Sequence, residues 1–363
     1  MSDYRSQVDI RLSGGDPDFE APPHVKEAAI AAIREGGPWT HYSFTGVPEF
    51  KEAVVDYYSK YGVKYDPSNV YPTAGSSPAL MAVIANLLGP GDECVVFDPT
   101  FGTHFRTPPL FGATVSHVPL DVEGFHMDPD TLRKKVSDRS KLMILCNPNN
   151  PAGTVYTRKE LQAIADVAAE HDIVVLADEI YNEFVYDDRK HIAFPSLSDM
   201  KERTVVVMSF SKNFAMTGWR LGYYIAPDAL AEKLGRLRVA AAPTTFVQKA
   251  GAAALTGPYE PVKKMREEYD KRRKYFVKRL NELDGISCHM FEGAFYAYPD
   301  IKELGITSAK FVEEFAKKEK VLLSDGSRFG PEIAPGHLRI PLVLPVEVLE
   351  TVATRMERYL KTL

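Results

Sequence analysis

Short apolar runs alternate with helical stretches between residues 69 and 227, and this alternation constrains the fold more than any other feature. The predicted strands are Cys94–Phe97, Thr114–Val118, Lys141–Cys146, Ile173–Ala177, Thr204–Met208 and Gly222–Ile225. Several are apolar nearly throughout, as expected for parallel strands that are buried on both faces. Between them, stretches such as Arg158–Glu170 carry apolar residues at helical spacing. The pattern predicts an α/β fold with a mostly parallel sheet flanked by helices.

The chain changes character after Ala250. The spacing predicts a long charged helix over 258–283, then four short strands and two helices. The strands are Ile286–Met290, Ala294–Tyr298, Val321–Ser324 and His337–Pro341, and the helices are Ser308–Lys318 and Val346–Leu360. This order indicates a smaller α+β domain, and 363 residues suffice for two domains. We expect a segment associated with the small domain at 1–36, a large domain at 37–256 and the small domain at 257–363.

Composition narrows the functional class. The net charge of −5 and the pI near 6.0 disfavour a nucleic-acid binder, which usually carries a basic excess. No apolar run reaches the ~18 residues of a membrane span, and the first residues lack an apolar signal core. Three separated cysteines form no CxxC pair, which fits a reducing compartment and no metal site. We expect a cytoplasmic protein that binds neither nucleic acid nor membrane.

Polar residues follow three predicted strands at the point where each strand ends. Asn147 and Asn150 follow the Lys141–Cys146 strand, Asp178 follows the next, and Ser209 and Lys212 follow the Thr204–Met208 strand. Any one of these would suit an ordinary turn. In a parallel sheet, however, the carboxyl ends of the strands line the ligand crevice. Their coincidence on three strand ends predicts a binding site.

The ligand is not indicated by the usual nucleotide motifs, because neither a G-x-G-x-x-G fingerprint nor a P-loop is present. Gly75 precedes an apolar helix over Ala79–Leu88 and permits close backbone approach, while Ser76 or Ser77 can cap the helix. The free amides at such a helix start offer an anion site. Taken alone, the segment is explained more simply by an ordinary capped helix.

Lys212 is more informative, because burying an ammonium group at a strand end is costly. Desolvation lowers the pKa of a lysine, and a partly neutral amine forms Schiff bases. Ser209, Arg220 and the helix start at Gly75 would together suit one phosphate. A lysine, a phosphate site and a carboxylate at a strand end are what pyridoxal 5′-phosphate (PLP) requires. The alternative for Lys212 is a solvated surface lysine.

A series of motifs resembles the class I/II aminotransferases, the PLP enzymes of the aspartate aminotransferase fold. The resemblance spans Gly15 to Arg339, and the motifs occur in the family's order. They are Leu12–Phe19, Tyr42–Gly46, Ala74–Ser77, Asp98–Phe101, Asn147–Thr154, Asp178–Tyr181, Ser209–Lys212, Gly218–Gly222, Gly293–Tyr296 and His337–Ile340. The resemblance implies fold type I, with a large PLP-binding domain built on a mostly parallel seven-stranded sheet and a smaller α+β domain.

The resemblance also implies roles around the cofactor ring. Lys212 resembles the lysine that holds PLP through a Schiff base and acts as general base and acid. Asp178 resembles the partner of the pyridine nitrogen, whose charge keeps that nitrogen protonated. Asn150 and Tyr181 match the donors to the phenolic oxygen. Phe101 is similar in place to the aromatic that stacks on the ring. The alternative for Phe101 is a core residue.

The remaining implied contacts concern the phosphate. Ser209, Arg220 and the amides at Ser76 and Ser77, next to Gly75, match the phosphate cup. Tyr42 resembles the tyrosine that reaches the phosphate from a partner subunit, which implies a homodimer with shared active sites. The alternative for Tyr42 is an ordinary packing tyrosine.

The implied substrate contacts begin with Arg339, which resembles the arginine that binds the α-carboxylate, assisted by backbone near Gly15. The alternative for Arg339 is a structural ion pair. Asn150 is also placed near the substrate by the resemblance. Ser77 stands where aspartate-acting relatives often carry lysine, so we expect no dedicated aspartate enzyme. His104 and Arg106 are candidate side-chain readers, although a solvated loop explains them more simply.

The function implied is a PLP-dependent aminotransferase that moves an amino group between an L-amino acid and a 2-oxo acid by a ping-pong mechanism. A β-eliminating C–S lyase on the same fold is the nearest alternative. A non-catalytic PLP-binding regulator is more remote, because such proteins usually carry a DNA-binding domain. A nicotinamide-dependent dehydrogenase is weakened by the missing glycine fingerprint.

Overall fold

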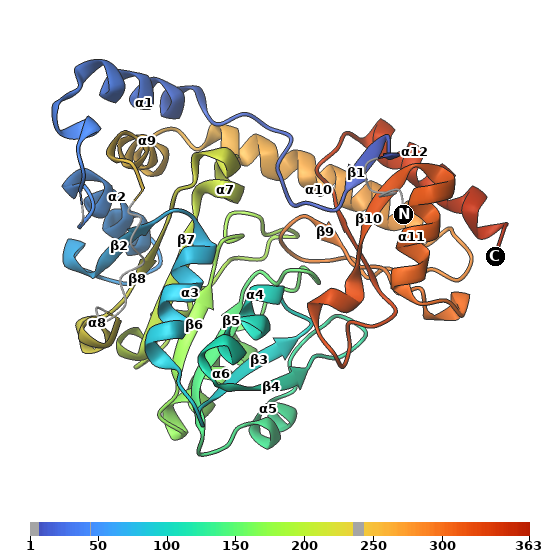
Figure 1. Cartoon of the computed structure of the whole chain (residues 1–363), viewed down its shortest axis with the longest axis horizontal. Coiled ribbons are helices and arrows are strands. Elements are labelled where there is room, and N and C mark those ends of the chain that lie inside the picture. Colours follow the sequence, from blue (N-terminus) through green and yellow to red (C-terminus); the bar gives the residue numbers. More distant parts are fainter. Residues whose placement is uncertain (1–6, 44, 235–242) are drawn as a thin grey trace.

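The computed structural model of the chain describes residues 7–43, 45–234 and 243–363, and these contain two β-sheets (Figure 1). The larger sheet has seven strands in the order β2-β8-β7-β6-β5-β3-β4, and the smaller has four in the order β1-β10-β11-β9. Helices cover the larger sheet, so the predicted α/β class is confirmed. Among the described residues, every helix is too short or too polar to cross a bilayer.

The large sheet is parallel except at one side. Its strands are β2 (Val70–Thr73), β3 (Glu93–Asp98), β4 (Thr114–Pro119), β5 (Ser140–Cys146), β6 (Val174–Asp178), β7 (Thr204–Ser209) and β8 (Gly222–Ile225). The strands β3 to β7 pair in parallel, whereas β8 is antiparallel to both β7 and β2. All the strands predicted in this region form within a residue or two of the expected bounds; β2, an edge strand with a proline, was not predicted.

The central strands are apolar throughout because both of their faces are covered. Along β5, Leu142 and Ile144 pack with residues of α3, whereas Met143 and Leu145 pack in a separate cluster with residues of α6. The period of two in the strand thus sends alternate side chains to opposite helical layers. This arrangement leaves the carboxyl ends of the parallel strands as the place where polar side chains gather.

Helices make up most of the remaining structure. They are α1 (Pro23–Glu35), α2 (Pro48–Ser59), α3 (Ser76–Leu87), α4 (Gly102–Arg106), α5 (Pro129–Lys135), α6 (Arg158–Glu170), α7 (Phe210–Asn213), α8 (Asp228–Leu234), α9 (Thr245–Thr256), α10 (Glu260–Leu280), α11 (Ser308–Glu319) and α12 (Val346–Leu360). The long charged helix predicted over 258–283 is α10. The two helices predicted after it are α11 and α12.

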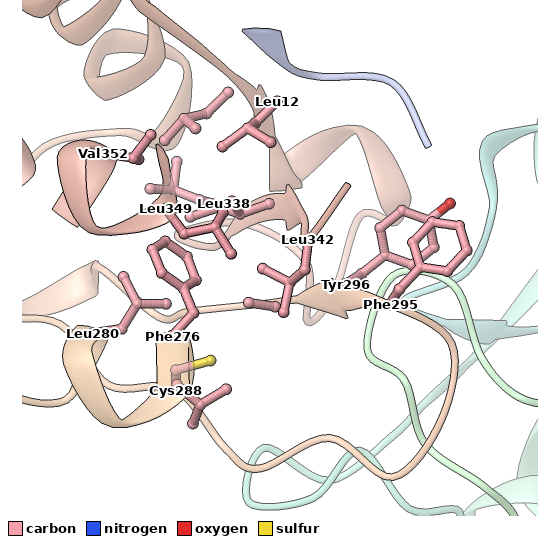
Figure 2. Packing of buried hydrophobic residues seen from close by; sticks show 14 of the residues in the cluster. Leu12, Phe276, Leu280, Cys288, Phe295, Tyr296, Leu338, Leu342, Leu349 and Val352 are labelled. Carbon is pink, nitrogen blue, oxygen red and sulfur yellow. The ribbon is translucent and has the colours of Figure 1, made fainter. Parts of the chain in front are cut away.

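The small sheet joins the two ends of the chain. Its strands are β1 (Ile10–Leu12), β9 (Tyr296–Ala297), β10 (Val321–Asp325) and β11 (Leu338–Pro341), and β1 pairs in parallel with β10. Figure 2 shows Leu12 of β1 beside Leu338, Leu349 and Val352, with Phe276 of α10 beneath them. The helix α1, in contrast, packs in one core with α2 and α9. Where the domains divide stays a prediction.

One predicted strand of this region is wrong. Residues 286–290 form only a single bridge, between Ser287 and Asp300. The side chain of Asn281 accepts a hydrogen bond from the Cys288 amide and donates one to the Cys288 carbonyl, both at 2.8 Å. These backbone groups are therefore bonded to a side chain and not to a neighbouring strand.

Candidate active site

The ends of β5, β6 and β7 lie side by side in the sheet and open on one cavity of about 400 Å³. Most of the residues that the sequence singled out line it: Gly15, Ser76, Ser77, Phe101, Asn150, Asp178, Tyr181, Ser209, Lys212, Arg220 and Arg339. They come from distant parts of the chain, from the turn at Gly15 to Arg339 on β11, and the topology brings them together. A cavity at the carboxyl ends of parallel strands is where such folds bind ligands.

Lys212 lies on the one-turn helix α7, which follows β7 directly. The Ser209 side chain accepts a hydrogen bond from the Ser211 amide at 3.1 Å and so starts this helix. The ammonium group of Lys212 donates a hydrogen bond to the Gly15 carbonyl. The pKa of Lys212 is lowered from 10.5 to about 8, mainly by burial and also by the nearby charges of Arg339 and Arg220, whereas Asp16 opposes the shift. The amine is therefore close to the neutral, nucleophilic form.

Asp178, the last residue of β6, is held by a buried histidine. Its Oδ2 lies 3.0 Å from His104 Nε2, and the other ring nitrogen of His104 lies 2.8 Å from the Thr100 hydroxyl. The side chain of His104 is completely buried. The simpler interpretation of His104 as a solvated loop residue is therefore wrong, because α4 turns it inward. Arg106, at the end of the same helix, is exposed.

The opposite end of the cavity is suited to an anion. The helix α3 begins at Ser76 with Gly75 before it, and no side chain caps it. The proposed cap by Ser76 or Ser77 is therefore wrong, and the first amides of α3 are left for a ligand. Arg220 donates to the carbonyls of Thr217 at 2.8 Å and Ala74 at 3.0 Å, which fixes its guanidinium beside this helix start.

Gly75 is required by this packing, although it does not itself line the cavity. Its φ of +102° favours glycine, and a Cβ there would lie 2.5 Å from Nη2 of Arg220. Gly222 meets the same segment, because a Cβ on Gly222 would lie 2.7 Å from the Gly75 carbonyl carbon. Close backbone contact thus brings Arg220 and the start of α3 together.

Arg339 lies on β11 and is almost completely buried. Its Nη2 donates to the Ser13 carbonyl at 2.8 Å, and its Nη1 donates to Oδ1 of Asn150 at 3.3 Å. Its Nε has no hydrogen-bond partner within the described residues. A buried guanidinium with donor capacity left over, on the wall of a cavity, is suited to a carboxylate ligand.

Tyrosine hydroxyls connect Arg339 to the strand ends. Asn150 donates to the Tyr181 hydroxyl at 3.3 Å, and the hydroxyls of Tyr181 and Tyr296 lie 2.8 Å apart. Burial raises the pKa of both Tyr181 and Tyr296, so both hydroxyls stay protonated. Tyr296 stands at the edge of the apolar cluster in Figure 2, with its hydroxyl directed away from the other labelled side chains.

Tyr296 is the principal site residue to which the sequence had assigned no role, and His104 had been considered only as a side-chain reader or a loop residue, not as a partner of Asp178. Tyr296 belongs to the Gly293–Tyr296 motif, so the motif was the available signal. It also explains Gly15, where a Cβ would lie 2.1 Å from the Tyr296 hydroxyl. For His104 the signal was its position three residues after Phe101, the residue that directly precedes α4. The cavity is also lined by Asp16, Cys146, Ile180, Ser211 and Thr217.

Tyr42 does not lie at the cavity of its own chain. It is 91% exposed and is absent from the cavity wall. Phe44 of the same motif lies outside the described residues. Within one chain, Tyr42 therefore does not form part of this cavity.

Comparison with known proteins identifies the family of the chain. The family profile described as aminotransferase class I and II matches residues 7–356. An aromatic-amino-acid aminotransferase 2 of Thermococcus litoralis is 40% identical, over 97% of this chain and 92% of its own. An aspartate aminotransferase of Pyrococcus abyssi is 39% identical over the same shares. The solved structure of an aromatic aminotransferase from Pyrococcus horikoshii, 39% identical, has a TM-score of 0.93 over 98% of this chain and 96% of its own. Sequence, fold and site therefore agree that the chain belongs to the aminotransferase class I and II family.

Proposed function

We propose that this protein is a PLP-dependent aminotransferase that transfers an amino group from an L-amino acid to a 2-oxo acid by a ping-pong mechanism. The observation that carries the proposal is one cavity lined by Lys212, Asp178 and Arg339. These three supply an amine, a buried carboxylate and a buried guanidinium. The family of the chain, whose members are PLP-dependent, supports the same conclusion.

The residues present fit PLP. The uncapped amides of α3 and the tethered Arg220 would hold its phosphate, together with Ser209. Asp178 would pair with the ring nitrogen, and Phe101 would lie against the ring face. Asn150 and Tyr181 would donate to the phenolic oxygen. When bound, PLP supplies an electron-accepting ring that stabilises negative charge at the substrate's α-carbon.

The chain's own residues then orient the substrate and move one proton. Arg339 binds the α-carboxylate through its guanidinium, which the Ser13 carbonyl and Asn150 already hold in place. The Nζ atom of Lys212, with its pKa lowered to about 8, accepts the proton that leaves the α-carbon and later returns one. The carboxylate of Asp178 would keep the ring nitrogen of PLP protonated, and His104 keeps Asp178 in position.

The proposal extends to the assembly and to the division of the chain. We propose a homodimer in which Tyr42 of one subunit completes the phosphate site of its partner. Its exposure and its absence from the wall of its own chain's cavity support this arrangement. We also propose the domain bounds 1–36, 37–256 and 257–363, and a cytoplasmic location.

The test is a screen of amino acids with 2-oxo acids on the purified, PLP-loaded protein. We expect amino transfer that needs both substrates, covalent fixation of PLP at Lys212 by borohydride, and loss of turnover by many orders of magnitude in Lys212→Ala. Borohydride label on another lysine would contradict the proposal. Release of pyruvate from a β-substituted donor without an oxo acid would indicate the lyase instead.

A further inference from the structure

Two buried asparagines join the segments that carry Tyr181 and Lys212. Asn182 follows Tyr181 in the turn after β6, and Asn213 follows Lys212 at the end of α7. Both asparagines are buried, with exposed fractions of 4% and 1%. Nδ2 of Asn213 donates a hydrogen bond to Oδ1 of Asn182 at 2.7 Å. Neither asparagine lines the active-site cavity, so this bond holds the two segments together from outside the cavity wall.

Two tyrosines set the direction of the Asn182 amide. Its Nδ2 donates to the hydroxyls of Tyr57 at 2.7 Å and Tyr61 at 3.0 Å. The Tyr57 hydroxyl donates its own hydrogen to Glu183 at 2.6 Å, so its oxygen accepts from Asn182. Burial raises the pKa of both tyrosines, which therefore stay protonated. With its Nδ2 directed to the tyrosines, Asn182 presents its Oδ1 to Asn213.

The helix α7 is too short to hold Lys212 in place by its own hydrogen bonds. It has four residues and so about one turn. Its start is fixed, because Ser209 caps it and the Phe210 amide donates to the Leu221 carbonyl at 3.1 Å. At its other end, the side chain of Asn213 supplies the bond to the turn after β6. Lys212 lies next to this end, so the bond helps to set its position.

Stability alone does not explain this pair. Burial of an amide costs free energy unless its polar atoms are bonded. Oδ1 of Asn213 has no partner within the described residues, so part of this cost is not offset. Two apolar side chains of similar volume would avoid the cost and fill the same space. The asparagines instead provide a directional bond, which apolar side chains would not.

We propose that Asn182 and Asn213 are positioning residues, whose hydrogen bond fixes where Lys212 stands relative to Tyr181. This inference rests on the proposed function, in which Nζ of Lys212 accepts the proton that leaves the α-carbon. A displacement of about 1 Å can cost a reaction about 100-fold in rate. Loss of one bond at the end of a helix that stays anchored at its start should cost less, about tenfold in kcat. KM should change little, because Arg339 binds the α-carboxylate without this bond.

The test is a double-mutant cycle on the PLP-loaded enzyme. Asn182→Leu and Asn213→Leu should each lower kcat by about tenfold, and the double variant by about the same factor, because either change already breaks the bond. Proton transfer should become slower relative to the other steps. An α-deuterated donor should therefore show a larger isotope effect on kcat in the variants than in the wild type. The pH titration of the PLP absorbance should shift as well.

Urea unfolding separates positioning from folding. Each single variant leaves one amide buried without its partner and should unfold at a lower urea concentration, whereas the double variant should recover towards the wild type. Its kcat should not recover with it. Asn213→Ser, whose hydroxyl is too short to reach Asn182, provides the same test if a leucine variant does not fold.

Asn69→Leu is the matched control. Asn69 is also buried, donates to Asp228 at 2.7 Å and does not line the cavity. This variant should lower the urea midpoint and leave kcat and the isotope effect unchanged. An unchanged kcat in the single variants, losses that multiply in the double variant, or losses that follow the urea midpoint would overturn the inference. A wild type that transfers no amino group from any donor would instead overturn the proposed function.

Discussion

Desolvation of the Lys212 amine lowers its pKa and so determines how readily it reacts. Burial is the main reason why its pKa falls from 10.5 to about 8, and Arg339 adds to the effect. We expect the rate at which the PLP-free protein attaches PLP to Lys212 to rise about tenfold per pH unit up to pH 8 and then level off, because only the neutral amine attacks. The measurement is the absorbance change after PLP is added at each pH.

The positive neighbours of Lys212 provide the control for that experiment. Arg339→Leu removes one charge that disfavours the ammonium form, so the plateau should move to higher pH. A rate that continues to climb to pH 10 in the unaltered protein would mean that Lys212 behaves as an ordinary solvated lysine.

The pair Asp178 and His104 predicts a graded series of variants. Asp178→Asn removes the charge that holds the ring nitrogen protonated, so kcat should fall by about 10² to 10⁴. His104→Gln removes only the hydrogen bond that positions Asp178, and should lower kcat by about 10- to 100-fold. His104→Gln should also shift the pH titration of the PLP absorbance, which a purely structural role would not move.

The control for this series is His117→Gln, on β4. His117 is a half-buried histidine near a different carboxylate, 3.7 Å from Asp98, and does not line the cavity. It should leave both kcat and the titration unchanged. Equal losses in the two histidine variants would show that His104 acts through folding alone.

Sequence motifs identified residues such as Lys212 and Asp178 because their chemistry is unusual at a strand end. They could not reveal that His104 bonds Asp178, because that contact joins residues 74 positions apart through the turn of α4. The motif that contains Tyr296 could not reveal its contact with Tyr181 for the same reason, because that contact spans 115 positions. The roles of the cavity residues stay predictions, although these residues line one cavity.

At the scale of elements, the spacing of apolar residues and the residues at helix ends predicted most of the helices and strands. The strands β3 and β5 to β8 are mostly apolar runs, whereas β4 is mixed, and α6 begins at Arg158 as predicted. The strands β1 and β2 are three and four residues long and carry little periodic signal. They exist because they pair with β10 and β8, which are distant in sequence. Short edge strands of this kind depend on tertiary partners more than on their own residues.

The start of α6 illustrates how an end signal stabilises an element. The Thr157 side chain accepts from the Glu160 amide at 3.3 Å, and the Glu160 side chain accepts from the Thr157 amide at 2.7 Å. We expect Thr157→Ala to lower the free energy of unfolding by about 1 kcal/mol. Thr157→Ser keeps the capping hydroxyl and should keep the wild-type value. Urea unfolding measures both. Thr351→Ala, on the exposed face of α12, should change it by less than about 0.5 kcal/mol; equal losses in the two alanine variants would contradict the capping role.

At the scale of the whole molecule, His126 joins segments that belong to different parts of the chain. Its Nδ1 lies 2.9 Å from Glu160 on α6, and its Nε2 lies 3.4 Å from Glu292, which precedes β9. Arg189 also pairs with Glu292. The hydrogen bond with Glu160, and then that with Glu292, raise the pKa of His126 from 6.5 to about 10. The histidine is therefore charged at neutral pH, although it is half-buried.

The raised pKa fixes how this junction depends on pH. A group whose pKa is higher in the folded state stabilises that state fully below its unfolded value of 6.5, and the stabilisation is lost as pH rises through about 10. We expect His126→Gln to cost about 2 kcal/mol of unfolding free energy at pH 6, the usual size for a hydrogen bond to a charged group. The cost should shrink as pH rises to 10. Urea unfolding at constant ionic strength measures it.

His117 gives the opposite sign and so serves as the control. Burial lowers its pKa below 6.5, despite the nearby Asp98. Its effect on stability should therefore change only as pH falls below 6.5, and His117→Gln should show a constant difference from the wild type between pH 7 and 10. A deficit of His126→Gln that is the same at pH 6 and pH 10 would mean that packing, and not the charge on His126, holds these segments together.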